Sequence, residues 1–462
     1  MRKIFGMALC FTLVGISFVN AAGRDQRSSS GGGTAEKPKV IQVWTNNAHS
    51  KPEYVAAVER YNKGEGAQRG ISIDYTVYGS DYYTVLDIAI SAGEEPYIYK
   101  VTGKLPQYVQ AENIIPLTDL PGWFQTKVVD RYKPYNIKGT TIFDGVPYTI
   151  PWAISGYCSI AYNVPLLKRA GFDAPPKTWE EFEKACIAIS KLDPGKLFGT
   201  YVPLRYPNYD TIYVTGAMAP SYGKFWFDFS TGRYCFSDMA EYFEMFQRIR
   251  DAGAMFPGIE SLDDDTARAQ FAEGNIGFEM INPSFNIGVF YDQFPAKMEW
   301  ATAPIPVKDP GKNYNVMGGT ATTLVVSRKA KDQKLLEEVA RVYDFWISDE
   351  VQMELFTNGK DLPIIPEIVQ KAKPSDRPQW NDLAALAAGT VLRPNFPDGF
   401  FAVEGDSVNT AFAKIFTGAN AAQILSDMDR RFNAAMDQAV SRGVIKREDF
   451  IMPEIEERFQ KK

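Results

Sequence analysis

The chain has 462 residues, a length that predicts two or three domains rather than one. Its composition, with 45% hydrophobic and 23% charged residues, is typical of a globular protein and excludes a disordered or membrane-embedded chain. The formal net charge is −6, and lysines and arginines are scattered along the sequence, so nucleic acid is not an expected partner.

Residues 1–22 have the pattern of a secretory signal peptide. Two basic residues precede an apolar segment at 4–19, and small residues that suit a cleavage site follow it. The apolar segment is shorter than the roughly 20 residues that a membrane-spanning helix needs. Cys10 lies inside this segment rather than at its end, so the pattern does not support a lipid anchor, and the mode of membrane retention stays open. Residues 23–37 are rich in serine and glycine and predict a flexible leader.

Strand and helix patterns alternate at the start of the mature sequence. Residues 40–44 predict a strand, and the helical spacing of apolar residues at 54–61 predicts a helix after it. The same two patterns recur at 71–77 and 82–89. This order favours a mainly parallel sheet with helices on both faces, whose ligands bind outside the carboxyl ends of the strands.

A second series of elements begins near the middle of the chain. A capping box at Thr178–Glu181 predicts the start of a helix that buries residues up to 189. An amphipathic helix is predicted from Asp238 to Ile249, and short apolar strands are predicted at 276–281 and 324–326. Helical patterns then dominate to the C-terminus.

Histidine and cysteine usage excludes several kinds of chemistry. His49 is the only histidine, which argues against catalytic triads and against zinc sites built from histidine and cysteine. We expect a surface or capping role for it. Cys158, Cys186 and Cys235 would remain after signal cleavage, and this odd number predicts buried free thiols rather than a disulfide framework.

Acidic clusters are the remaining candidates for catalysis, because glycosidases need only carboxylates. Glu94 and Glu95 follow a predicted helix end, and residues 263–265 precede the helical stretch 266–272, where acidic side chains cap free amides. Neither cluster is specific for an acid–base pair. Gly318 and Gly319 lack the lysine and the following helix of a nucleotide site, so no cofactor is expected.

Aromatic residues are more informative, at 13% of the chain, because flat rings stack on the apolar faces of sugar rings. A role in the core is an equal alternative for each of them. The aromatic candidates at strand ends or in loops are Trp44, Tyr78, Trp152, Tyr157, Tyr209 and Phe285.

A set of motifs occurs in order across almost the whole mature chain. They are Phe143 to Tyr148 closed by Ile150-Pro151-Trp152, then Tyr162-Asn163 with Ala170-Gly171-Phe172 and Pro175 to Phe182, then Phe271 to Gly277, Gly318-Gly319-Thr320, and Thr417-Gly418 with Ala421. In this order the motifs resemble the extracellular solute-binding proteins of carbohydrate importers, the family that includes maltose-binding protein.

The resemblance implies an α/β fold in the form of a two-lobe clamp. Each lobe would be a mainly parallel sheet flanked by helices, and crossing segments would form the hinge. Residues 38–151 and 305–359 would make the N-terminal lobe, and residues 152–304 and 360–462 the C-terminal lobe. The implied function is that of a periplasmic or extracytoplasmic, non-catalytic monomer, which captures a carbohydrate or sugar-like ligand and delivers it to the permease of an ABC transporter.

The resemblance also implies which residues line the cleft. Asparagine and aspartate side chains would bind sugar hydroxyls, and glycine would allow close approach of the backbone. The residues carried over are Trp44, Asn46, Asn47, Tyr78, Asp81, Lys100, Thr102, Trp152, Tyr157, Tyr209, Asn282, Phe285, Gly318, Gly319 and Glu404. No metal ligand is among them.

Departures from the family's pattern leave the identity of the ligand open. Residues 282–285 read Asn-Pro-Ser-Phe where members commonly have Gly-Pro-Trp, and Tyr97 replaces the usual aspartate after proline. A secreted carboxylate-dependent glycosidase and a chemosensory binding module are the alternative functions. A glycosidase would form product, whereas a receptor and a sensory module cannot be separated on sequence.

Overall fold

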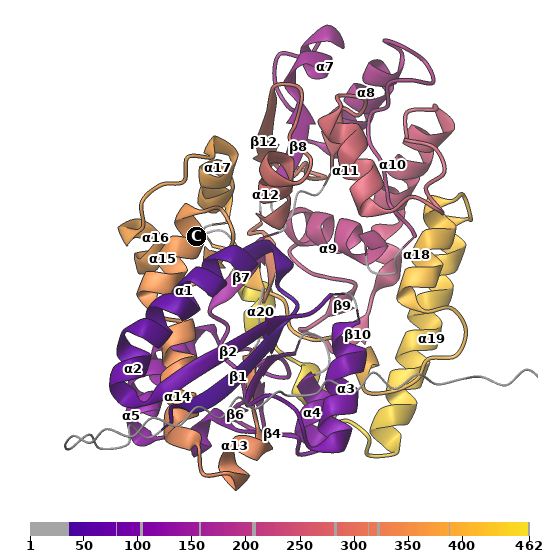
Figure 1. The fold of residues 1–462 in the computed structure, drawn as a ribbon. Helices are drawn as coiled ribbons and strands as arrows, with labels where there is room; N and C mark the ends of the chain where they lie inside the picture. The colour runs from indigo at the N-terminus through magenta and orange to yellow at the C-terminus, as the bar shows by residue number, and fades with distance from the viewer. Residues whose placement is uncertain are drawn as a thin grey trace, which may run out of the picture. The chain divides into compact units, whose positions relative to one another are not determined.

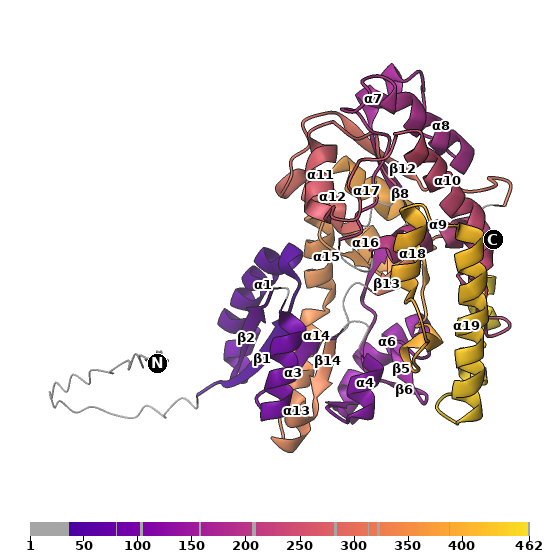
Figure 2. The ribbon, with the colours of Figure 1, turned by 90° about the vertical axis from the view of Figure 1, so that its right-hand side faces the viewer.

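The computed structural model describes residues 37–79, 81–101, 105–156, 159–205, 209–280, 284–312, 314–320, 324–387 and 389–460. The expected signal peptide lies outside these residues, as does all of the expected leader except Lys37. Pro38–Lys462 forms one compact unit, in which helices surround several small sheets (Figures 1 and 2).

The first sheet has five strands in the order β2-β1-β3-β14-β4. The strands are β1 (Lys39–Thr45), β2 (Ile71–Val77), β3 (Ile98–Lys100), β14 (Leu324–Ser327) and β4 (Ile114–Ile115). β1 is parallel to both β2 and β3, as predicted, whereas β14 is inserted antiparallel between β3 and β4. The sheet therefore joins the beginning of the chain to a segment more than two hundred residues later.

Helices cover both faces of this sheet, because successive side chains of a strand point to opposite faces. On β14, Val326 belongs to a core cluster with α1 (Lys51–Lys63) and α14 (Leu336–Trp346), whereas its neighbour Val325 packs in another cluster with α3 (Tyr82–Ala92). Within the first cluster the rings of Tyr54 on α1 and Trp346 on α14 stack with centroids 4.3 Å apart. The expectation of helices on both faces is confirmed.

A second sheet contains β8 (Ser159–Asn163) between β11 (Phe278–Glu279) and β12 (Trp300–Pro304). β8 is antiparallel to both neighbours, so the expectation of a mainly parallel sheet is wrong for this part of the chain. Parallel pairing is present beside it only as isolated bridges among the described residues, such as Phe198 with Ile276. Hydrophobic periodicity sets which face of a strand is buried, but it does not set the direction of the strand.

The helices around this second sheet begin where the sequence predicts. Thr178 and Glu181 form the capping box of α8 (Trp179–Ser190), and Asp263 caps α11 (Asp264–Ala272) by accepting a hydrogen bond from the backbone of Thr266. Cys186 on α8 is a fully buried free thiol, as expected.

The other α-helices lie along the whole described chain, and two short hairpins accompany them. The helices are α2 (Glu65–Arg69), α4 (Leu105–Gln110), α5 (Gly122–Phe124), α6 (Asp130–Tyr132), α7 (Val164–Arg169), α9 (Tyr209–Tyr222), α10 (Ala240–Asp251), α12 (Ser284–Asp292), α13 (Arg328–Asp332), α15 (Asp349–Thr357), α16 (Pro366–Lys371), α17 (Pro378–Leu386), α18 (Val408–Phe416), α19 (Ala421–Ser441) and α20 (Pro453–Phe459). The hairpins are β5–β6 (Ile142–Phe143, Val146–Pro147) and β9–β10 (Phe227–Asp228, Arg233–Tyr234).

A third sheet of four strands has the order β15-β7-β13-β16. Its strands are β15 (Leu362–Pro363), β7 (Ala153–Gly156), β13 (Met317–Thr320) and β16 (Val391–Leu392), which come from distant parts of the chain. None of the described helices is both long enough and apolar enough to span a membrane.

Candidate functional site

Polar side chains gather at the carboxyl ends of β1 and β3. The Lys100 Nζ donates a hydrogen bond of 2.6 Å to Oδ1 of Asn47, whose side chain is buried. Asn46 lies beside Asn47, and its Oδ1 is buried with no hydrogen-bond partner among the described residues. Three of the predicted residues are thus brought together, because neighbouring parallel strands end at one edge of a sheet.

The ammonium group of Lys100 lies in a setting that disfavours its charge. Burial lowers the pKa of Lys100 to about 8, and the nearby carboxylate of Asp361 acts in the opposite direction. The Tyr82 hydroxyl on α3 shares its one proton between the backbone carbonyl oxygens of Lys100 (2.8 Å) and Trp44 (3.2 Å). Helix α3 therefore fixes the ends of both strands.

Two predicted aromatic residues meet at the same edge. The ring centroids of Trp44 and Tyr78 are 4.9 Å apart with an interplanar angle of 58°, and both rings are partly buried. Burial raises the pKa of Tyr78, and Asp74 and Asp81 add to this effect. Asp81 is exposed and directly precedes α3, so it belongs to the same neighbourhood.

Asp361 is the residue of this site that the sequence did not predict. Its side chain is 4% exposed, its Oδ1 lies 3.2 Å from Nε2 of His49, and its Oδ2 has no hydrogen-bond partner among the described residues. The carboxylate also raises the pKa of Tyr54 and Tyr75, after the larger effect of burial. Asp361 precedes β15, and no motif in its neighbourhood signals a role beside β1.

Other predicted residues lie on different elements of the fold. Trp152 is 0% exposed and packs in the core with Ile150, which favours its alternative role as a core residue. Gly318 lies on β13, where a Cβ would come within 2.5 Å of Thr390 Cγ2 and 3.0 Å of the Ser155 carbonyl oxygen, so a larger residue would require its neighbours to shift. Gly319 pairs with Ser155 on β7.

The remaining predicted residues have no described contact with this site. Glu404 is exposed, and its backbone carbonyl accepts a hydrogen bond from Arg431 on α19. Thr102, Tyr157 and Asn282 lie outside the described residues. Tyr209 and Phe285 are placed by their backbones only, at the first position of α9 and in the first turn of α12.

The assembled site offers hydrogen-bond donors and acceptors beside two aromatic rings. Amide, ammonium and carboxylate groups come from Asn46, Asn47, Lys100 and Asp361. Within the part of the chain that the structure describes, no three His, Cys, Asp or Glu side chains are grouped to hold a metal ion. Such a set of groups suits recognition of a polar, partly apolar small molecule.

Comparison with known proteins gives matches in sequence and matches in structure. The chain matches the family described as bacterial extracellular solute-binding protein over residues 47–353, more than half of its length. A curated relative is a binding protein of Brucella abortus (strain 2308), 24% identical over 256 residues. That match covers 55% of this chain and 58% of the relative, so the chain spans little more than half of the relative's length.

Solved structures show the same fold over more of the chain. An ABC substrate-binding protein from Listeria monocytogenes, in complex with cycloalternan, has a TM-score of 0.63 at 18% identity and covers 87% of this chain and 99% of that chain. The maltose/maltodextrin-binding domain from Bdellovibrio bacteriovorus, bound to maltotriose, has a TM-score of 0.65 at 17% identity, with 87% and 100% covered. These likenesses confirm the predicted two-lobe α/β fold. Together with the family match, they show that the chain belongs to the bacterial extracellular solute-binding protein family.

Proposed function

We propose that the protein captures a sugar or sugar-like solute outside the cytoplasm and delivers it to the permease of an ABC transporter. The observation that carries this proposal is the cluster at the carboxyl ends of β1 and β3. There the amides of Asn46 and Asn47 and the ammonium of Lys100 lie beside the rings of Trp44 and Tyr78. Amides and ammonium groups bind hydroxyls, and rings pack on the apolar face of a sugar.

The similar structures support a carbohydrate rather than another solute. Their ligands include cycloalternan, raffinose and maltotriose. We further propose that residues 38–151 with 305–359 and residues 152–304 with 360–462 are the two lobes, and that a ligand closes them on each other. Residues 1–22 would direct secretion, and the mature protein would act as a monomer that does not alter its ligand.

A thermal-shift screen of mono- and oligosaccharides tests the proposal. A ligand that binds only the folded protein stabilises it by about 2.7 kcal/mol when its free concentration is one hundred times its Kd. We expect at least one sugar to raise the Tm and to be recovered intact, at one equivalent per chain. Stabilisation by peptides or metal ions with none by sugars would contradict the carbohydrate ligand. Repeated turnover of a sugar would instead identify a glycosidase.

A further inference from the structure

A buried polar cluster lies in the second sheet, apart from the β1–β3 edge. Glu279 on β11 is 2% exposed and Asn286 on α12 is 1% exposed. Arg268 on α11 and Tyr201 are also buried. The strand residue opposite Glu279 is Ala161 on β8, which brings no charge. An ionised carboxylate in such surroundings is unfavourable unless its oxygens are paired.

The side chains of Glu279 and Asn286 could form two hydrogen bonds with each other, and only one of them is formed. The Asn286 Nδ2 donates to Oε1 of Glu279. The other oxygen of each side chain, Oε2 of Glu279 and Oδ1 of Asn286, is buried with no hydrogen-bond partner among the described residues. As a carboxylate, Glu279 could not satisfy Asn286 Oδ1, because both atoms are acceptors. A proton on Oε2 would turn this atom into the donor that Asn286 Oδ1 lacks, and the pair would then be reciprocal.

The charges around Glu279 agree with a bound proton. Burial raises the pKa of Glu279 to about 8, and the negative charge of Asp264 adds to this. Arg268, Asn286 and Tyr201 act in the opposite direction, but the effect of burial is larger. The guanidinium of Arg268 already forms ion pairs with Asp265 at 3.1 Å and with Asp264 at 3.9 Å. Its positive charge is therefore shared among the carboxyl groups of Asp264, Asp265 and Glu279.

We propose that Glu279 is a protonated acid that fixes the start of α12 to the end of β11, through a reciprocal acid–amide pair with Asn286. Phe285, a predicted ligand contact, directly precedes Asn286 in the first turn of this helix. Glu279 is then a positioning residue for the ligand site, a statement that rests on the proposed function. Deprotonation breaks the pair and releases the helix start.

The substitution Glu279→Gln tests the proposal, because glutamine forms the same reciprocal pair at every pH. The ligand-free protein is unfolded with urea, and a sugar that is positive in the thermal-shift screen is titrated, both between about pH 6 and pH 9.5. For the wild type, we expect stability to fall as the pH rises from about 6 to about 8 and to level off above that, because the unfolded chain has already lost this proton at pH 6. Affinity should fall about three- to tenfold as the pH rises through about 8, where the folded protein loses the proton. Glu279→Gln should lose the part of each decline that Glu279 causes, and its affinity should be within about threefold of the wild-type value at low pH. The pH dependence that remains in this variant belongs to other groups, such as Lys100, whose pKa is also about 8, and Glu456, whose pKa is about 7.

A matched variant and an independent signal keep the outcomes distinct. Glu279→Ala removes the pair and should bind more weakly at every pH. If it fails to fold, the glutamine variant alone decides. The carbonyl stretch of a protonated carboxylic acid should appear in infrared difference spectra between the two ends of the pH range. The part of this signal that titrates at about pH 8 should be lost in Glu279→Gln, and the part that titrates at about pH 7, from Glu456, should remain. This signal needs no ligand, so it tests the pair even if no sugar binds and the proposed function fails.

Either of two results would overturn the proposal. A wild-type protein without a pH-dependent decline, together with a Glu279→Gln variant that binds weakly at every pH, would show a carboxylate paired with Arg268. A pH-dependent stability with an affinity that does not change would show that the pair exists but does not position the site.

Discussion

Trp44 and Trp152 differ in how deeply their side chains are buried, although the sequence predicts both as ligand contacts. Trp152 is 0% exposed, whereas Trp44 is partly buried beside Tyr78. We expect Trp152→Ala to lower the free energy of unfolding by about 3–5 kcal/mol, because it leaves a cavity in the core. We expect Trp44→Ala to weaken sugar binding by roughly 1–3 kcal/mol with little effect on unfolding, since it removes a stacking surface.

Urea unfolding of the ligand-free variants and calorimetric titration of the sugar measure these two effects separately. Trp380→Ala is the control, because Trp380 is equally buried but packs in a different core cluster. It should destabilise the protein as much as Trp152→Ala and leave affinity unchanged. If the Trp152→Ala variant has normal stability but no longer binds the sugar, Trp152 is a ligand contact and not a core residue.

At the residue scale, sequence reasoning could find side chains that follow strands but not those brought in from elsewhere. Asn46, Asn47 and Lys100 were predictable because parallel strands end at one edge. Asp361 lies far along the chain from them, and its proximity to His49 depends on how the chain returns to the first sheet. The burial of Trp152 depends on the packing of several helices, and local pattern does not encode that packing.

At the scale of elements, ion pairs of the turn after α15 link α1 to α12. In this turn the Lys360 Nζ lies 3.7 Å from a carboxylate oxygen of Glu53 on α1 and 3.2 Å from one of Asp292 on α12. Arg377, just before α17, pairs with the same Asp292 at 2.8 Å. The side chains of Lys360 and Glu53 are only 15% and 12% exposed, so solvent screens their interaction little.

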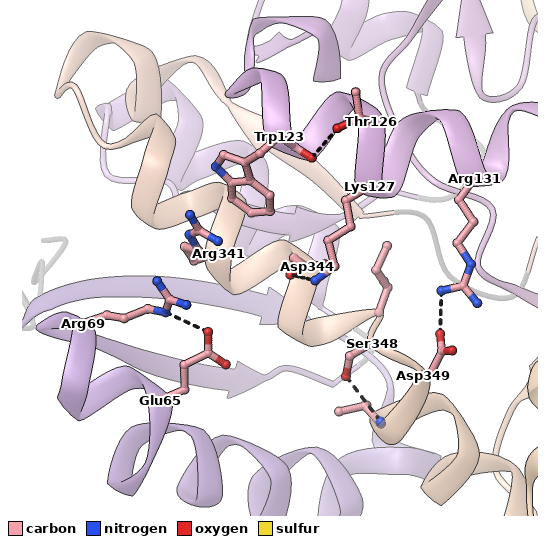
Figure 3. Close-up of polar contacts among 12 residues, drawn as sticks. Glu65, Arg69, Trp123, Thr126, Lys127, Arg131, Arg341, Asp344, Ser348 and Asp349 are labelled. Carbon is pink, nitrogen blue, oxygen red and sulfur yellow. Dashed lines mark hydrogen bonds and ion pairs between the residues drawn. The ribbon is translucent and has the colours of Figure 1, made fainter.

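We expect Lys360→Met to lower the free energy of unfolding by about 1–2 kcal/mol, because it leaves the carboxylate of Glu53 without its cation. Lys127→Met is the matched control. Lys127 pairs with Asp344 at 2.6 Å (Figure 3), and their side chains are 63% and 19% exposed. Its loss should change stability by less than about 0.5 kcal/mol. Equal effects of the two substitutions in urea unfolding would contradict a special role for the turn.

Element boundaries were predictable where the signal is local. The capping box of α8 and the aspartate cap of α11 use side chains within a few residues of the helix start, so they are readable from the sequence. The antiparallel direction of β11 and β12 beside β8 was not predictable. Strand direction depends on the path of the connecting segments, and apolar spacing does not record that path.

At the scale of the whole molecule, the third sheet marks where the chain crosses between its two main core clusters. Ala153 on β7 belongs to the cluster of the first sheet, and its neighbour Ile154 belongs to the cluster of the second sheet. On the adjacent strand β15, Leu362 belongs to the second-sheet cluster, and Ile365, shortly after it, to the first. Backbone torsion at such crossings could move one cluster against the other without disturbing either core.

This arrangement predicts that a bound sugar makes the protein more compact. For residues 38–462, a fully compact chain has a radius of gyration of about 22 Å, and an open pair of lobes has a larger one. Small-angle scattering with and without a saturating sugar should show a decrease at constant mass, and a sugar that gives no thermal shift should produce none. A ligand favours the closed form only through contacts that the open form lacks, so Trp44→Ala should require more sugar for the same decrease. An unchanged scattering profile at saturation would mean that the site on the first sheet binds without the second lobe, which would contradict a closing clamp.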